Sequence, residues 1–583
     1  MEKNSSLPRP VHAPARRASR HPTIFLGILL ALATTLYFGP TYEAVKSRCH
    51  SAISSSHAKD SLDSVKWSQD QLKEYSKCPV QPKPLHPKMT WEMTSEEKER
   101  SIKLYSEAVQ IPTQSYDDNG EPGEDERWAP FFDFQKWLNT TFPLATQTAR
   151  IEYINKLGIL ATFEGSDPSL KPLLLMSHYD VVPAPPSTYD RWTYPPFSGH
   201  IDDEFVWGRG AADDKTLLVA QWESITHLLE NGFKPRRTLI LSHGFDEEEV
   251  FARRGQGHIA PFLEERYGND GLLMVIDEGS GASDDFYGGA FALPAMGEKG
   301  YMDIEISVGT AGGHSSVPPT HTGIGIMSQI VLGLEDHPFS EKLTPATPML
   351  QALMCAKDHA PSFPHEYSKL LKKEGPKSYP KLAQTLSSES LFNKAMLGTT
   401  TAVDVFHGGV KVNALPELVK AQVNFRIDFT ESIQSTKDHV ARILKRVAKK
   451  NSLQLSAWEG KDGDKDLGGR YIKVELIGKA LEPAPRTPSS GGVWELFAGT
   501  VKSALPAPDG SERIVTPYHS TGNTDCKMYY NLTKHVYRFM GSSGGKSGNA
   551  HTVDERASIA SHFQIISWIH AIIQNADAYD GEQ

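Results

Sequence analysis

Leu173-Leu-Leu-Met-Ser-His-Tyr-Asp-Val-Val-Pro183 is the stretch of this 583-residue sequence that organises the rest of it. An apolar run of strand length ends at His178, and Asp180 comes two residues later. On an extended chain the side chains at i and i+2 point the same way, so the imidazole and the carboxylate share one side. This pattern fits a metal-binding histidine oriented by a carboxylate. In a chain with 22 histidines, a single His-x-Asp is more often a surface or capping pair, so its meaning depends on the rest of the chain.

Strands and helices alternate after this stretch. Apolar segments at 173–177, 238–243 and 271–276 are separated by segments with helical character at 214–230 and 258–267. Near-continuously apolar strands that alternate with helices predict an α/β fold with a largely parallel sheet covered on both faces. In open sheets of this kind, ligands bind beyond the carboxyl ends of the strands.

Polar residues follow the ends of three of these strands. They are His178, the adjacent pair Glu247 and Glu248, and Asp277 with its neighbour Glu278. The side chains of Glu247 and Glu248 diverge, so one could bind a metal while the other faces a water molecule. Either Asp277 or Glu278 could be the ligand at its strand end. Because these groups share one edge of the predicted sheet, that edge is the candidate site.

Two further motifs add acids and a second histidine. Gly208-Arg-Gly-Ala-Ala-Asp-Asp-Lys215 ends at a predicted helix N-terminus, where its aspartates could also serve only as capping acids. Asn549-Ala-His-Thr-Val-Asp554 carries His551 in a glycine-rich region. Each motif taken alone is more often structural than functional.

A second unit is predicted inside the first. An alternating strand at 301–308 opens it, a long irregular insertion covers 337–400, two strands lie within 400–428, and an amphipathic helix covers 431–450. The expected organisation is a basic cytosolic tail (1–22), a transmembrane signal anchor (23–39), a stalk or wrapping segment (40–92), a catalytic domain in two parts (93–300 and 476–583) and an inserted α+β domain (301–475).

The N-terminal region predicts a membrane anchor. A basic segment precedes Thr23-Ile-Phe-Leu-Gly-Ile-Leu-Leu-Ala-Leu-Ala-Thr-Thr-Leu-Tyr-Phe38, which carries no charge. The positive-inside rule then leaves the N-terminus in the cytosol and the body in a lumen, as in a single-pass type II protein. A cleaved signal peptide is the alternative, since Ala31-Leu-Ala33 resembles a cleavage site. The sequons at Asn139 and Asn531 are potential glycosylation sites and agree with a lumenal body.

Composition excludes some classes of function. The formal net charge of −10 argues against a nucleic-acid-binding protein. The four cysteines are widely spaced and form no C-x-x-C pair, which argues against a thiolate zinc site. Cys49 and Cys78 could pair in an oxidising compartment.

Taken together, the motifs resemble those of the di-zinc peptidase family M20, and within it the carboxypeptidase S (Gly-Xaa carboxypeptidase) branch. They occur in the family's order over about residues 90–575. The motifs are Ser177-His-Tyr-Asp-Val-Val-Pro183, Trp207-Gly-Arg-Gly-Ala-Ala-Asp-Asp-Lys215, Asp246-Glu-Glu248, Ile276-Asp-Glu-Gly279, Gly312-Gly-His-Ser-Ser-Val-Pro318, Asn413-Ala-Leu-Pro-Glu417, Asn523-Thr-Asp525 and His551-Thr-Val-Asp-Glu-Arg556.

The resemblance implies two zinc ions per chain, with cobalt as a substitute. It assigns His178 and Asp277 to one ion, Glu248 and His551 to the other, and Asp213 as the bridge between them. Glu247 would be the general base, Asp180 would orient His178, and the peptide bond between Asp213 and Asp214 would be cis. Imidazole and carboxylate ligands suit zinc or cobalt.

The resemblance also implies a lid and a homodimer. The inserted domain would be the family's lid and dimerisation domain, with His314 stabilising the oxyanion, often across a dimer. Asn413 and Arg426 would bind the free carboxylate of the substrate, a task that suits the planar fork of arginine. After the glutamate pair the branch usually has a hydrophobic residue and two glycines. Here the sequence is Glu249-Val-Phe-Ala-Arg-Arg-Gly255, which leaves the shape of the pocket open.

The expected function is that of a membrane-anchored metallocarboxypeptidase in a vacuolar or secretory lumen, acting on short peptides of the Gly-Xaa type. Two alternatives stay open. One is hydrolysis or synthesis of N-acyl amino acids in the same site. The other is an inactive receptor or binding protein on this fold.

Overall fold

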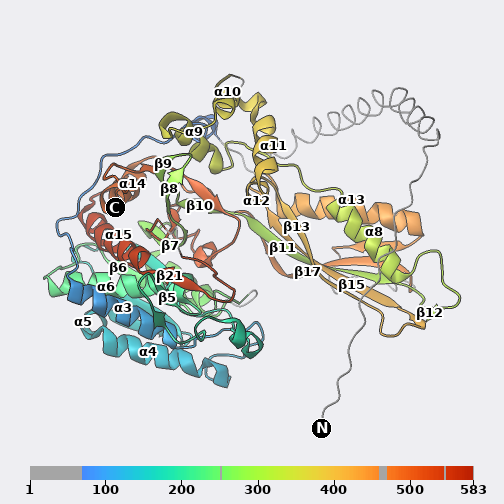
Figure 1. Cartoon of the computed structure of the whole chain (residues 1–583), viewed down its shortest axis with the longest axis horizontal. Helices are drawn as coiled ribbons and strands as arrows, with labels where there is room; N and C mark the ends of the chain where they lie inside the picture. Colours follow the sequence, from blue (N-terminus) through green and yellow to red (C-terminus); the bar gives the residue numbers. More distant parts are fainter. Residues whose placement is uncertain (1–67, 250–252, 374, 459–468, 544–546, 582–583) are drawn as a thin grey trace, which may run out of the picture. The chain divides into compact units, whose positions relative to one another are not determined.

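The chain is built on an eight-stranded sheet with the order β1-β2-β6-β3-β7-β20-β10-β19 (Figure 1). The computed structural model describes residues 68–249, 253–373, 375–458, 469–543 and 547–581. The four central strands run parallel. The strands are β1 (Arg150–Ile154), β2 (Gly158–Phe163), β6 (Leu239–Gly244), β3 (Leu173–His178), β7 (Met274–Ser280), β20 (Val536–Phe539), β10 (Ala295–Glu298) and β19 (Tyr518–Ser520).

Both faces of this sheet are covered, which explains the continuous apolar runs of its strands. On β3, Leu173 and Leu175 enter one hydrophobic core, while Leu174 and Met176 enter another core on the opposite face. The prediction of a largely parallel, doubly covered sheet is therefore confirmed. The helices are α3 (Ser95–Gln110), α4 (Ala129–Thr141), α5 (Pro143–Thr148), α6 (Thr216–Glu230), α14 (Gly492–Ala504) and α15 (Ile559–Ala578) on the first face and α7 (Gln256–Tyr267) on the second.

A second sheet is formed by the middle of the chain, with the order β13-β15-β11-β17-β16. Burial alternates along β15, so only one face of the sheet is covered, by helices α8 and α13 (Figure 1). The elements are β11 (Gly300–Gly309), β13 (Thr400–Gly408), β15 (Leu418–Ile427), β16 (Gln454–Ala457), β17 (Tyr471–Leu481), α8 (Gly323–Glu335) and α13 (Ile433–Asn451). An inserted α+β unit is thus present, as expected.

The insertion predicted as irregular at 337–400 is mostly helical. Four short helices pack around a core that includes Leu350, Leu353, Leu382 and Leu386. Short helices depend on such tertiary packing, which a local pattern does not reveal. The helices are α9 (Met349–His359), α10 (His365–Lys373), α11 (Tyr379–Glu389) and α12 (Leu391–Leu397).

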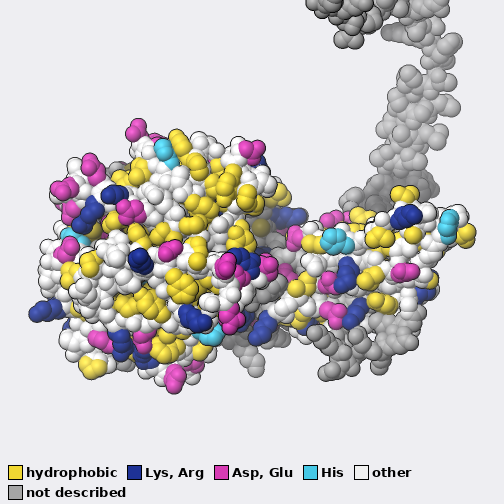
Figure 2. Space-filling view, turned by 90° about the horizontal axis from the view of Figure 1, so that it is seen from below, with side chains coloured by type: hydrophobic (Ala, Val, Ile, Leu, Met, Phe, Trp, Pro, Cys, Tyr) yellow, Lys and Arg dark blue, Asp and Glu magenta, His cyan; other side chains and the backbone are white. Residues whose placement is uncertain are grey.

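Small strands complete the fold. They form three minor sheets: β8 (Ala282–Phe286), β9 (Gly289–Ala292) and β18 (Ile514–Val515); β4 (His200–Ile201), β5 (Phe205–Trp207) and β21 (Arg556–Ser558); and β12 (Gly313–His314) with β14 (Ala414–Leu415). On the face shown in Figure 2, lysine and arginine side chains are interspersed with aspartate and glutamate side chains.

The segment from residue 68 to about 93 wraps the body, so this part of the predicted stalk does not stand apart. It begins with helix α2 (Gln69–Glu74). The backbone N–H of Leu85 donates to Gly499 O at 2.8 Å, and Gln574 bonds both the N–H and the C=O of Met89 at 2.9 Å. These contacts show that the segment runs along the surface formed by α14 and α15.

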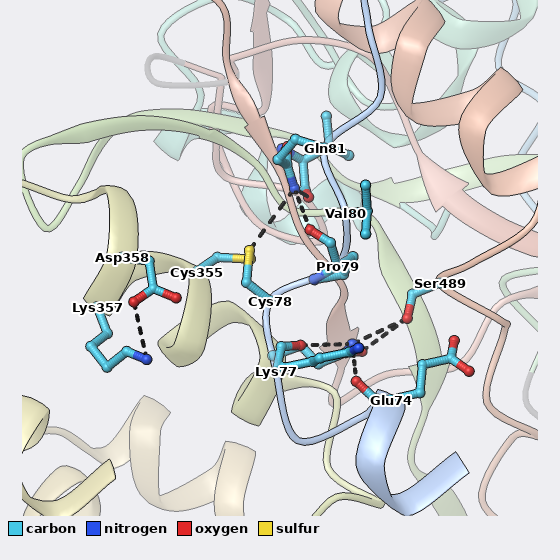
Figure 3. The surroundings of a disulfide bond; sticks show 12 residues. Glu74, Lys77, Cys78, Pro79, Val80, Gln81, Cys355, Lys357, Asp358 and Ser489 are labelled. Atoms are coloured by element: carbon cyan, nitrogen blue, oxygen red, sulfur yellow. Dashed lines mark hydrogen bonds and ion pairs between the residues drawn. A yellow bond between two sulfur atoms is a disulfide. The ribbon is translucent and has the colours of Figure 1, made fainter. Parts of the chain in front are cut away.

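A disulfide joins Cys78 of this segment to Cys355 of α9 (Figure 3). Gln81 continues the attachment, since its side chain bonds both the C=O and the N–H of Val515. The sequence suggested Cys49 as the partner of Cys78, and Cys49 lies outside the described residues. The structure pairs Cys78 with Cys355 instead, so the suggested pairing was wrong. The pairing crosses 277 residues of sequence, so no local pattern could have identified it.

The predicted membrane anchor also lies outside the described residues. Among the helices that the structure describes, none is both long enough and apolar enough to span a bilayer.

Trp91 holds the wrapping segment against two histidines. Its indole stacks on the ring of His227, with centroids 4.0 Å apart. His227 Nδ1 lies 3.1 Å from Nε2 of His570 on α15. Burial lowers the pKa of His227, and burial with the neighbouring His227 lowers the pKa of His570 to about 4. Both imidazoles are therefore neutral in the folded protein near neutral pH.

Acidification is expected to destabilise the fold through His570. Between about pH 6.5 and 4 the unfolded chain binds a proton at His570 that the folded chain does not, so stability is complete above this window and is lost as the pH falls through it. The shift corresponds to at most about 3 kcal/mol. Urea unfolding of the wild type and His570→Gln at both ends of the window measures it. The variant should lose less stability on acidification, and equal losses would contradict the prediction.

Candidate metal centre

Three central strands deliver acidic and imidazole side chains to one edge of the sheet. His178 is the last residue of β3, Glu247 and Glu248 come just after the end of β6, and Glu278 lies near the end of β7. β3 pairs in parallel with both β6 and β7, so these carboxyl ends meet. The candidate site therefore lies where open α/β sheets bind their ligands.

Asp213 lies between the two histidines. Its Oδ1 is 3.1 Å from His178 Nε2, and its Oδ2 is 3.2 Å from His551 Nε2. His551 Nε2 is also 3.0 Å from the carboxylate of Glu248. His178, Asp213 and Glu248 each offer a ligand atom, and these atoms lie within 4.8 Å of one another. The structure thus brings together four of the five residues assigned as metal ligands.

The fifth assignment, Asp277, differs in its surroundings. Asp277 Oδ2 accepts a hydrogen bond from Cys526 Sγ at 3.2 Å. Glu278 Oε1 is instead 3.6 Å from His178 Nε2, and ligand atoms of His178, Glu247 and Glu278 lie within 4.8 Å of one another. The pairing of β7 with β20 skips residues 278 and 279, so the strand is irregular here, and the Glu278 side chain reaches toward His178 while Asp277 bonds the thiol of Cys526. Of the two candidates that the sequence left open, the structure turns Glu278 toward the cluster.

Asp180 connects the histidine to the glutamate pair. The ring Nδ1 of His178 lies 3.0 Å from the backbone O of Asp180 and 3.4 Å from its Oδ1. The same carboxylate accepts the backbone N–H groups of Glu247 and Glu248 at 3.2 and 3.1 Å, and the hydroxyl of Ser115 at 2.8 Å. Asp180 is fully buried, so these bonds set where the glutamate pair begins relative to His178.

The loop before α6 presents Asp213. The peptide bond between Asp213 and Asp214 is cis, as the resemblance implied. Tyr105 donates to the backbone O of Ala211 at 2.6 Å. Lys215 Nζ donates to the backbone O atoms of Ala108 and Ile111, so the loop is attached to the end of α3.

The electrostatics of the cluster fit a bound cation. Burial raises the pKa values of Glu247, Glu248 and Glu278. Burial alone would lower the pKa of His178, but the surrounding carboxylates raise it well above its usual value. Hydrogen bonds to the carboxylates, with burial opposing them, raise the pKa of His551 to about 10. A divalent metal ion suits this hard oxygen and imidazole donor set, and its positive charge would favour the deprotonated form of each group.

The residues expected to bind substrate lie on the second sheet and its loops. His314 is the last residue of β12 and Asn413 directly precedes its partner strand β14, and both side chains are exposed. His314 Nδ1 lies 2.7 Å from Ser316 Oγ. Over the part of the chain that the structure describes, no hydrogen bond or ion pair joins His314 or Asn413 to the metal cluster. Arg426 Nη1 donates to Asn523 Oδ1 at 3.0 Å, which links β15 to the catalytic unit.

Of the bulky residues that follow the glutamate pair, residues 250–252 lie outside the described part of the chain, and Arg254 is held at a neighbouring surface loop. The guanidinium of Arg254 contacts the carboxylate of Glu249, the backbone O atoms of Asn119 and Gly120, and the face of Trp128. This arginine therefore fastens the loop to a neighbouring surface loop.

Both potential glycosylation sites are exposed. Asn139 lies on α4, where its amide donates to Gln135 O and to Tyr153 Oη. Asn531 comes after Tyr530 on an exposed turn, and its backbone O accepts the N–H of Asp270 at 2.8 Å.

Comparisons with known proteins show what the chain is similar to. The model of a family described as "Peptidase family M20/M25/M40" matches residues 174–575. The chain is 40% identical over 495 residues to Carboxypeptidase S of Saccharomyces cerevisiae, covering 82% of this chain and 84% of the relative. It is 31% identical over 497 residues to the human N-fatty-acyl-amino acid synthase/hydrolase PM20D1, covering 83% and 89%. The solved M20 family metallo-carboxypeptidase Sso-CP2 from Sulfolobus solfataricus shares the fold, with a TM-score of 0.54, 18% identity and coverage of 84% and 100%.

Proposed function

The chain belongs to peptidase family M20, and from this we propose that it is a di-zinc metallocarboxypeptidase that removes the C-terminal residue of short Gly-Xaa-type peptides. The observation that carries the proposal is the convergence of His178, Asp213, Glu248 and His551, with Glu247 beside them. The 40% identity to a carboxypeptidase S supports the reaction class.

The ligand set would divide between two sites that share Asp213. His178 and Glu278 would hold one ion, and Glu248 and His551 the other. Two metal ions so held would supply Lewis acidity toward the scissile carbonyl and toward water near neutral pH. Zinc suits the donors, and cobalt is the expected substitute.

The remaining residues would move protons and position the groups. Glu247 would take the proton of the attacking water and pass it to the leaving amine. Asp180 would keep His178 oriented through Nδ1 and hold the backbone of the glutamate pair. Because Asp180 is fully buried, these bonds would allow little movement of the His178 ring or of the backbone at Glu247 and Glu248.

The second sheet would act as the lid. We assign residues 301–475 to the lid and dimerisation domain, and residues 93–300 with 476–583 to the catalytic domain. Arg426, oriented by Asn523, would bind the substrate's carboxylate together with Asn413. His314, which is exposed in the single chain, would complete the oxyanion site from a second copy in a homodimer.

The body would work in a vacuolar or secretory lumen, anchored by residues 23–39. The bond between Cys78 and Cys355 supports an oxidising compartment. The exposed sequons at Asn139 and Asn531 agree with that location.

A second reaction is favoured by one specific finding. The chain is 31% identical to a human N-fatty-acyl-amino acid synthase/hydrolase. Cleavage of an N-acyl amino acid breaks the same type of amide bond next to a free carboxylate, so the same groups would serve both reactions.

Metal content and substrate preference test the proposal together. The purified lumenal body should hold about two zinc ions per chain, and a chelator should abolish its cleavage of a blocked Gly-Leu dipeptide. Rates on this dipeptide and on N-fatty-acyl amino acids are then compared. Faster cleavage of the acyl amino acids would support the second reaction, two zincs without hydrolysis of any amide would point to a binding protein, and absence of metal would overturn the ligand assignment.

A further inference from the structure

Glu555 makes an unusual set of contacts beside the metal centre. Its Oε1 accepts the backbone N–H groups of Gly210, Ala212 and Asp213 at 3.0, 3.0 and 3.2 Å. Its Oε2 accepts Nη1 of Arg209 at 2.5 Å. Glu555 is 1% exposed, so water does not compete for these bonds. One carboxylate thus binds most of the loop that presents Asp213.

The segment that carries Glu555 also carries His551. It is closed at its base by mutual backbone bonds between Gly548 and Arg556, at 3.0 and 3.2 Å. Asp554 accepts the N–H and the hydroxyl of Thr193, at 2.6 and 2.9 Å. The side chain of His551 itself is 54% exposed. The position of the His551 ring therefore depends more on the bonds that attach the segment than on packing around the ring.

We propose that Glu555 is a positioning residue that sets the spacing between Asp213 and His551 by holding the loop 210–213 against the segment 548–556. The inference rests on the proposed function, because it concerns two of the three residues, Asp213, Glu248 and His551, that are assigned to one ion. Asp213 and His551 come from segments far apart in the sequence. The carboxylate of Glu555 accepts the backbone N–H of Asp213, and Glu555 lies four residues after His551 on the same segment.

The chemistry of the contact requires a carboxylate of this length. Three N–H groups that converge on one oxygen form a concave anion site, and a charged acceptor binds them more strongly than a neutral one. Arg209 balances the charge, so the buried carboxylate is tolerated. Glutamine would lose the charge and turn an amide N–H₂ toward either Arg209 or the loop. Aspartate would keep the charge but is one methylene too short to keep all the bonds.

The test compares Glu555→Gln with wild type by amide hydrogen exchange of the metal-free protein and by zinc competition with a chelator. We expect faster exchange in the peptide covering 209–215, zinc binding weakened about 10- to 100-fold, and a lower kcat with little change in KM. If Glu555→Gln does not fold, Glu555→Asp is expected to change the same readouts in the same direction.

Glu223→Gln is the matched control. Glu223 is also a buried carboxylate, on α6, where it accepts the hydroxyl of Ser101 at 2.7 Å and lies 3.4 Å from His562 Nε2; among the described residues it makes no hydrogen bond or ion pair with residues 209–215. Its loss should cost stability without changing exchange at 209–215 or zinc affinity. The inference is overturned if the two glutamine variants behave alike, or if Glu555→Gln keeps wild-type exchange and zinc affinity. Because exchange and metal binding are measured without substrate, an inactive wild-type protein would overturn the proposed function and leave this test intact.

Discussion

Replacing Glu247 with glutamine will lower kcat about 10²- to 10⁴-fold, the range that a general base contributes, while the metal content stays at the wild-type value. Glu247 lies just beyond the end of β6, and its backbone N–H is held by Asp180 at 3.2 Å. Glutamine preserves this backbone bond and nearly the same volume but cannot accept a proton. The measurement is kcat on a blocked Gly-Leu dipeptide together with zinc analysis of the same preparation.

The metal analysis decides between two roles for Glu247. Its carboxylate also lies in a group with His178 and Glu278 whose ligand atoms are within 4.8 Å of one another. A ligand role would therefore show itself as loss of zinc in the glutamine variant, and that result would contradict the assignment of Glu247 as the base. Glu152→Gln serves as control, since this partly buried glutamate pairs with Arg266 far from the cluster and should leave both readouts unchanged.

The second large effect is expected at Glu278. Glu278→Gln should weaken zinc binding by at least about 100-fold, because loss of an outer-shell partner alone costs 10- to 100-fold. Zinc content should fall from about two ions per chain toward one, with a corresponding loss of activity. Asp277→Asn should keep both ions, because Asp277 accepts the Cys526 thiol and, unlike Glu278, is in neither group of clustered ligand atoms among the described residues. Chelator titration of the two variants measures the difference.

The opposite pattern of zinc loss in these two variants would contradict the assignment of Glu278 as a ligand. If Asp277→Asn loses zinc and Glu278→Gln keeps it, the assignment based on family resemblance holds and the geometric one fails. Both changes replace one carboxylate by an amide of similar size at neighbouring positions of β7, so each variant is the control for the other.

The fold of the catalytic unit was predictable to a large extent. The three apolar runs ending near His178, Gly244 and Asp277 proved to be adjacent parallel strands. Helix α3 begins after Thr94, which forms a capping box with Glu97. These features depend on local periodicity and on capping, which the sequence displays directly. The helices of residues 349–397 were missed because their short apolar faces acquire meaning only when packed together.

The candidate site was predictable in its residue types but less so in its geometry. His178, Asp213, Glu248 and His551 could be named from motifs and do converge. The choice between the acids at 277 and 278 required knowledge of which face of β7 meets the cluster. Glu555 was part of a quoted motif, yet its role appeared only with its contacts to the loop 210–213.

The sequence by itself determined which side chains are available and which strands deliver them, because the period of apolar residues and the chemistry of carboxylates and imidazoles are local properties. Only the tertiary structure decided how distant segments meet. It paired Cys78 with Cys355 across 277 residues, and it set Glu555 against the N–H of Gly210, 345 residues away. The physical reason is that such contacts depend on how sheets and helices pack as whole surfaces, and short-range sequence patterns carry no record of that packing.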